Sequence, residues 1–300
     1  VPSARVDPID APRNVVSDEQ LRGLIAAVRE RLGPDAWIAV DQEGGRVARL
    51  NPRRGFPGDP SAADFAALDP PERVRAARAM ADRLANFGFD LNFAPCVDLD
   101  LNPDNPIIGG LERSFGRDVS TVVGAATTVL DAHAAAGVAA CLKHFPGHGS
   151  SRGDTHRGVV DVTETWHREE LDPFHALCHR PGVAVMVAHV MHRGLDPERP
   201  ASLSPKVIGD LLRGDLGFDG VVVTDSIDMR AIADAWSPEG AAVEAVRAGA
   251  DLVVDAFNLT PGREHPAPSI VAALREAIDA TRVAESVERL ERLREQIQRT

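Results

Sequence analysis

Short apolar segments alternate along this 300-residue chain with longer segments in which apolar residues recur at helical spacing. The short segments lack the apolar–polar alternation of a strand with one wet face, so they predict parallel strands covered on both sides. Six such strands are expected, at residues 36–40, 89–95, 139–144, 183–188, 221–224 and 252–255. Helices are expected at residues 69–86, 121–136, 204–213, 238–248 and 269–298.

Polar side chains follow nearly every predicted strand. They are Asp41, Gln42, Glu43, Asp98, Lys143, His144, His189 and Asp225. A doubly wound sheet would bring together only the strand ends near its switch point, whereas a barrel gathers all of them on one face. We therefore predict an α/β fold, a single (β/α)8 TIM-like barrel domain over residues 1–300. It is expected to be irregular or incomplete at its N-terminus, because only six strands are evident and the first 35 residues would have to supply the others.

Composition excludes several classes of partner. The net charge of −12 disfavours nucleic acid and anionic membranes, both of which attract basic surfaces. No apolar segment approaches the ~20 residues of a membrane span. The N-terminal residues lack the pattern of a signal peptide, and three widely spaced cysteines suit neither a disulfide framework nor a zinc ribbon. A cytoplasmic protein is expected.

The densest group of titratable residues follows the strand at 139–144. Residues 143–156 read KHFPGHGSSRGDTH and contain a lysine, three histidines and an aspartate. A zinc site on His144, His148 and His156 is disfavoured, because a proline and a glycine between the first two prevent a helical ligand pair. A G-x-S-x-G sequence at residues 149–153 lies in mid-loop, away from the strand–helix junction that gives that motif meaning.

A third interpretation of this loop pairs Asp154 with His156. A carboxylate beside an imidazole fixes its tautomer and raises its proton affinity, which makes a general acid for neutral pH. Asp225 follows another buried strand and could either cap the next helix or act as a nucleophile. A carboxylate nucleophile with a proton donor is the equipment of retaining glycoside hydrolysis.

Several motifs together resemble bacterial glycoside hydrolase family 3, in its β-N-acetylglucosaminidase branch. They are DQEGGRVAR, FAPCVDLD, KHFPGHG followed by DTH, MVAHV and GVVVTDSIDM, in the family's order over roughly residues 13–255. The resemblance implies release of N-acetylglucosamine from peptidoglycan fragments, with no metal or organic cofactor. It implies Asp225 as nucleophile, His156 as acid/base and Asp154 as its partner.

The same resemblance implies a set of residues that hold the sugar ring. They are Asp41, Arg49, Arg113, Lys143 and His144. Charged donors and acceptors of this kind suit sugar hydroxyls and an acetamido oxygen, and three tryptophans with no tyrosine leave little aromatic stacking. Serine at position 226 departs from the family, which usually has a second aspartate there. Glycosyl transfer to phosphate or another acceptor, and a glycan-binding protein without turnover, are the alternative functions.

Overall fold

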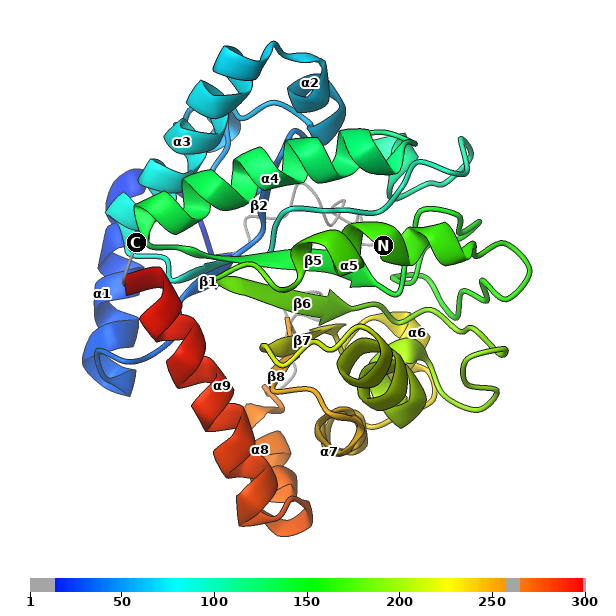
Figure 1. Ribbon diagram of the computed structural model, residues 1–300. Helices are drawn as coiled ribbons and strands as arrows, with labels where there is room; N and C mark the ends of the chain where they lie inside the picture. Colours follow the sequence, from blue (N-terminus) through cyan, green and yellow to red (C-terminus); the bar gives the residue numbers. More distant parts are fainter. Residues whose placement is uncertain (1–13, 257–264, 299–300) are drawn as a thin grey trace, which may run out of the picture.

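The computed structural model of the protein describes residues 14–256 and 265–298. At its centre is a parallel sheet of six strands in the order β1-β4-β5-β6-β7-β8. The strands are β1 (Ala39–Val40), β4 (Leu91–Asn92), β5 (Ala139–Phe145), β6 (Val183–Val187), β7 (Val222–Ser226) and β8 (Leu252–Val254). Each overlaps one of the six predicted strands. The sheet curls and is surrounded by helices, so the predicted α/β fold with an incomplete barrel is confirmed (Figure 1).

The first described residues of the chain form a helix instead of additional strands. Helix α1 (Asp18–Leu32) begins after Ser17, whose side chain accepts a hydrogen bond from the Gln20 amide, and it buries Leu21 and Ile25. The expectation that the first 35 residues supply the remaining strands is therefore wrong for residues 14–35, and residues 1–13 lie outside the description. The segment after β1 forms an antiparallel hairpin of β2 (Gln42–Gly44) and β3 (Val47–Ala48), which is not among the predicted strands.

Helices follow most strands. Three match the predicted ones closely: α3 (Pro70–Phe87), α4 (Val119–Ala136) and α7 (Pro238–Ala248). The sequence patterns missed α2 (Ala62–Ala67), α5 (Asp172–Leu177), α6 (Arg230–Ala233) and the short helices η1 (Pro52–Arg54), η2 (Gly109–Leu111), η3 (Arg168–Leu171) and η4 (Ala201–Leu203). The helix predicted at 204–213 is a π-helix, η5 (Lys206–Asp215). None of the described helices combines the length and apolarity that a membrane span requires.

The single helix expected at residues 269–298 is wrong, because the segment forms two helices, α8 (Ala267–Ala277) and α9 (Ala280–Gln298). The chain is extended at Ile278, and the Asp279 side chain accepts a hydrogen bond from the Arg282 amide (2.9 Å). This is the geometry of an N-terminal helix cap, which starts a new helix.

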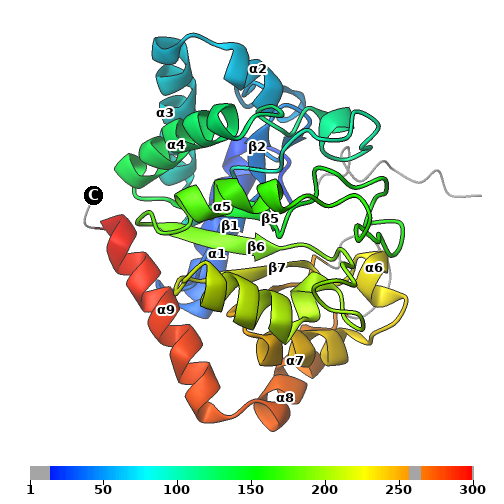
Figure 2. The same cartoon turned by 45° about the vertical axis from the view of Figure 1, so that its right-hand side comes forward.

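Both faces of the sheet are buried, as the uniformly apolar strands predict. Leu142 and Val185 point to the face that packs against the outer helices. Cys141 and Met186, one position along, belong to a second cluster on the other face, which Leu293 and the neighbouring turns of α9 cover. In Figures 1 and 2, the helices α2–α4 are drawn above β5–β7 and α6–α7 below them, around the outside of the curled sheet, with α9 in red across the strand beginnings. The loops that carry the polar residues lie at the opposite, C-terminal ends of β5–β7.

Candidate active site

Lys143 is the centre of a charged cluster at the ends of β1 and β5. Its ammonium group lies 3.2 Å from Asp41 Oδ1 and 2.5 Å from Glu43 Oε1, and only 2% of its side chain is exposed. Arg49, on the far side of the hairpin, donates to Asp41 Oδ2 at 3.2 Å. Burial would raise the pKa of Asp41, but the charges of Lys143 and Arg49 outweigh it and hold this pKa well below its usual range.

Arg113 approaches the same cluster from the loop after β4. Its Nε and Nη2 atoms donate to the two oxygens of Glu43, each at 2.8 Å, and Nη2 also lies 3.1 Å from His144 Nε2. Although burial opposes ionisation, the positive charges of Arg113 and Lys143 lower the pKa of Glu43 to about 2. The structure thus brings together Asp41, Arg49, Arg113, Lys143 and His144, the five residues expected to hold a sugar.

Glu43 is a site residue to which the sequence analysis gave no role. Its carboxylate joins Arg113 to Lys143 and so fixes two of the expected sugar-binding groups. A signal for Glu43 itself was present, because it is among the polar residues that follow the first predicted strand, although nothing in the sequence indicated its partners.

Asp98 is a second residue without an assigned role. Its Oδ2 atom accepts from His144 Nδ1 at 2.6 Å, and its Oδ1 atom accepts from the His148 amide at 2.8 Å. Arg113 can only donate, so His144 Nε2 accepts from it and the imidazole is in its Nδ1–H form. Asp98 therefore orients the His144 ring towards Arg113.

Asp154 and His156 form the predicted pair. Asp154 Oδ1 accepts from both the backbone amide (2.9 Å) and Nδ1 (2.8 Å) of His156, which leaves Nε2 as the outward-facing nitrogen. Burial opposes a charged imidazole, but the Asp154 hydrogen bond and the negative charges of Asp225 and Asp154 outweigh it and raise the pKa of His156 above its ordinary value. The ring is partly exposed and can meet a ligand.

Asp225 lies near the end of β7 and is half-buried. Burial would raise its pKa, but the charges of neighbouring histidines, His189 first among them, outweigh it and lower this pKa. The Ser226 amide donates to Asp225 Oδ1 at 2.7 Å, and His189 Nε2 donates to the Ser226 carbonyl at 2.8 Å. Asp225 is therefore an ionised carboxylate on a fixed backbone, electrostatically coupled to His156.

The alternative interpretations of the loop at 143–156 find no support in its geometry. Ser151, the central serine of the G-x-S-x-G sequence, is fully buried and lies 2.7 Å from His148 Nδ1. His144 Nδ1 is directed at Asp98 instead, so these two histidines do not face a common ligand. Burial lowers the pKa of His148 to about 4, with the nearby His144 contributing, so it is neutral and structural at ordinary pH.

One group in the described part of the chain has the composition of a metal site: Cys96, Asp98 and His144, whose ligand atoms all lie within 4.8 Å of one another. These atoms already satisfy each other, since Cys96 Sγ and His144 Nδ1 both donate to Asp98 Oδ2. Burial, followed by the charge of Asp98, raises the pKa of the Cys96 thiol well above its ordinary value, which disfavours the thiolate that metals require. We assign the group to hydrogen bonding.

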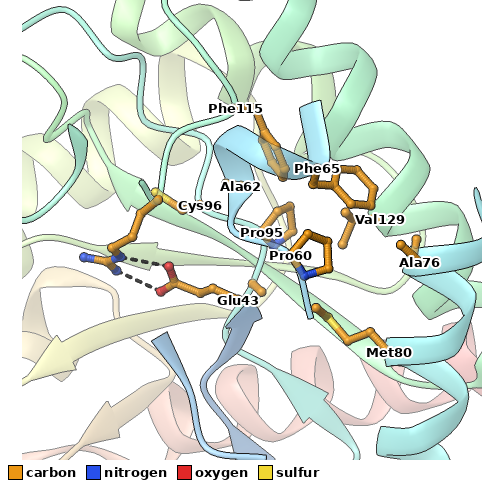
Figure 3. A pocket seen from close by; sticks show the side chains of 13 residues that line it. Glu43, Pro60, Ala62, Phe65, Ala76, Met80, Pro95, Cys96, Phe115 and Val129 are labelled. Atoms are coloured by element: carbon orange, nitrogen blue, oxygen red, sulfur yellow. Dashed lines mark hydrogen bonds and ion pairs between the residues drawn. The ribbon is translucent and has the colours of Figure 1, made fainter. Parts of the chain in front are cut away.

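A small cavity lies behind the Glu43–Arg113 pair, among α2, α3 and α4 (Figure 3). Its lining is largely apolar and includes Phe65, Met80 and Val129. The cavity volume of about 20 Å³ is room for about one water molecule and far too little for a sugar ring. This cavity is therefore not the predicted sugar-binding site.

The chain matches a known protein family over nearly its whole length. Residues 8–297 match the glycosyl hydrolase family 3 N-terminal domain. A β-hexosaminidase from Stenotrophomonas maltophilia (strain K279a) is 38% identical over 252 residues, which are 81% of this chain and 73% of the relative. β-Hexosaminidase A from Pseudoalteromonas piscicida is 36% identical over 237 residues, 73% of this chain but 39% of that relative.

Solved structures of proteins with a similar fold point to the same family. A family 3 β-N-acetylglucosaminidase from Paenibacillus sp. str. FPU-7 superposes with a TM-score of 0.84 at 36% identity, over 96% of this chain and 56% of that one. A β-N-acetylhexosaminidase from Beutenbergia cavernae gives 0.78 at 33% identity, over 94% and 83%. The chain belongs to glycosyl hydrolase family 3, as its motifs predict. The expected enzyme class, a glycosidase, is confirmed with it.

Proposed function

We propose that the chain is a retaining β-N-acetylglucosaminidase that uses Asp225 as nucleophile and the Asp154–His156 pair as acid/base. The observation that carries the proposal is the coupling of the two groups: His156 is polarised by Asp154 and lies within the electrostatic influence of the ionised Asp225. A carboxylate nucleophile together with a proton donor is what a retaining glycosidase requires.

The reaction proceeds in two steps. The Asp225 carboxylate attacks the anomeric carbon while His156 Nε2–H protonates the glycosidic oxygen, so the bond from that carbon to the leaving oxygen breaks. His156 is then neutral, and it takes a proton from the water that attacks the same carbon and releases Asp225. Asp154 stabilises the charged imidazole in the resting enzyme and fixes Nδ1–H away from the substrate.

The charged cluster beside this pair is suited to hold the sugar. Asp41 accepts from Arg49 and Lys143 but keeps a partly exposed carboxylate, which can accept hydrogen bonds from sugar hydroxyls. Glu43 and Asp98 hold Arg113 and His144 in place before the substrate arrives, which spares the cost of ordering them on binding.

We infer that residues 1–300 form a single barrel domain, which the match over residues 8–297 supports.

The cellular context is part of the same proposal. We infer that the protein is in the cytoplasm and acts there on peptidoglycan fragments. In support, Cys96, Cys141 and Cys178 are all free thiols in buried positions, as a reducing compartment permits.

A panel of nitrophenyl glycosides, assayed with and without phosphate, tests this function. We expect release of nitrophenol from the β-N-acetylglucosaminide and not from the β-glucoside, at the same rate in both buffers. Phosphate-dependent release with formation of a sugar phosphate would instead identify glycosyl transfer. Binding of N-acetylglucosamine without turnover of any glycoside would contradict the proposal.

A further inference from the structure

Glu170 is a buried carboxyl group that the proposed chemistry does not use. It lies in η3, directly before α5, and only 1% of the residue is exposed. Its Oε2 atom accepts hydrogen bonds from the amides of Gly149 (3.0 Å) and Ser150 (3.3 Å), and its Oε1 atom accepts from the amide of His167 (3.1 Å). One carboxylate thus joins η3 to the loop at residues 146–156, here called the acid/base loop.

The contact is tight on the loop side. A Cβ atom at Gly147, whose φ is +127°, would lie 2.5 Å from Glu170 Cβ, and one at Gly149 would lie 1.7 Å from the Leu99 carbonyl oxygen. Gly147 therefore lets the loop backbone pass directly over the Glu170 side chain, and Gly149 lets it pass against the Leu99 backbone. Asp154 follows Ser150 by four residues, so displacement of this anchor would reach the pair that handles the proton.

The geometry favours the ionised form of Glu170. A carboxylate accepts from N–H donors at both oxygens without presenting a hydrogen to any of them, whereas an amide in the same place would direct its own hydrogens at one of these donors. Burial opposes ionisation of Glu170. Together with a smaller contribution from the charge of Asp98, it raises the pKa of this carboxyl group to about 7. The charge of Asp98 acts on it, His148 lies between the two loop glycines, and His167, Arg168 and Glu169 directly precede it in the chain.

We propose that Glu170 is a positioning residue, whose carboxylate holds the acid/base loop where His156 can deliver its proton to the glycosidic oxygen. This inference rests on the proposed function, because it concerns the same Asp154–His156 pair. It assigns Glu170 a role in proton delivery that can be separated from a role in general stability.

Glu170→Gln tests the inference, because it removes the charge with little change in shape. A misplaced proton donor should lower kcat by roughly ten- to a hundred-fold for substrates with poor leaving groups, such as N-acetylglucosamine disaccharides, with little change in KM. Nitrophenyl glycosides need little protonation and should lose far less. The matched control is Glu169→Gln, which removes a neighbouring exposed charge of the same element and should leave both substrates unchanged.

Two outcomes would overturn the inference: equal loss on both substrates, or behaviour like Glu169→Gln. A parallel His156→Ala variant separates this failure from that of the proposed function. If His156→Ala discriminates between leaving groups and Glu170→Gln does not, only the role of Glu170 is wrong. If His156→Ala does not discriminate, the acid/base assignment itself fails.

The wild-type enzyme provides a second test that does not depend on how the variant folds. As pH falls through about 7, protonation of Glu170 should lower the ratio of kcat for the disaccharide to kcat for the nitrophenyl glycoside. Protonation of His156 alone would raise this ratio, because a charged imidazole is the better acid. A ratio that rises steadily towards low pH would overturn the inference.

Discussion

Around Lys143, each charged residue is held by a neighbour of opposite charge, and this has a consequence for substitution. The compact ammonium lies between Asp41 and Glu43 with almost no exposed surface, so a planar guanidinium would have to displace one of them. Lys143→Arg should therefore raise KM and lower kcat/KM by roughly tenfold or more, with the fold retained.

The other lysine of the chain supplies the control for this prediction. Lys206 is exposed at the start of η5, so Lys206→Arg should be silent in the same assay. Wild-type kcat/KM in Lys143→Arg, with an unchanged melting temperature, would mean that Lys143 only neutralises the nearby carboxylates and that its role towards the sugar is wrong.

His156 gives the prediction on proton transfer. His156→Ala should slow substrates with poor leaving groups by ~10²–10⁴-fold and activated aryl glycosides far less. Because the folded protein raises the pKa of His156, the alkaline limb of the wild-type kcat/KM profile should lie above pH 6.5. Asp154→Asn removes the partner and should move this limb to lower pH.

An exposed histidine on α5 serves as the control: His175→Ala should match the wild type on both kinds of substrate. An alkaline limb that stays in place in Asp154→Asn would show that another group carries the proton.

At the scale of elements, the strands were predictable because each segment carries its own signal. A run of apolar residues that is buried on both faces can be recognised locally, and β5 and β7 contain such runs. The break between α8 and α9 was missed because the apolar spacing continues across Ile278, while the Asp279 cap is a single residue. The hairpin was missed because Gly44 and Gly45 resemble an ordinary turn.

The predicted site residues could be found because the strands that carry them have local signals. The residues that hold them in place, Glu43 and Asp98, were assigned no role. Lys143, His144 and Asp225 lie near the ends of recognisable strands. Glu43 and Asp98 act through contacts with residues that lie far away in the sequence: Arg113 is 70 positions from Glu43, and His144 is 46 from Asp98. One sequence contains no signal for such pairs.

Helix α9 depends on one buried carboxylate at the start of β8. Asp251 has no exposed side-chain surface and accepts from Arg213, Arg282 and Arg289, two of which belong to α9. Asp251→Asn would remove the buried counter-charge that these three arginines share and should lower the free energy of unfolding by about 3–5 kcal/mol. Kinetic constants of the folded enzyme should not change, because Asp251 lies at the end of the sheet opposite the site.

Asp219 offers a matched control, since it pairs with Arg289 and Arg292 of α9 but is 71% exposed. Asp219→Asn should cost no more than about 1 kcal/mol in urea unfolding. Equal losses in the two variants would show that burial of Asp251 is not what anchors α9.

For the whole molecule, the site makes stability depend on acidity. Asp41, Glu43, Asp98 and Asp225 all have lowered pKa values in the folded protein, so the unfolded chain binds more protons below about pH 4.5. Their contribution is present above that pH and is lost as pH falls through the folded pKa values. The urea midpoint should therefore drop steeply between pH 4.5 and pH 3.

Glu43→Gln makes this prediction specific. The variant should be less stable than the wild type at pH 6, because Arg113 and Lys143 lose a counter-charge, but it should lose less stability on acidification. An identical acid-induced drop in both proteins would show that the cluster does not contribute to the pH dependence.

The central claim is that Asp225 forms a covalent bond to the sugar, and trapping that bond tests it most directly. A 5-fluoro donor of N-acetylglucosamine should label the wild-type protein once, and peptide mapping should place the sugar on Asp225. Asp225→Asn should remain folded, lose turnover and take up no label. A label on Glu43 or Asp228, or full labelling of Asp225→Asn, would contradict the account.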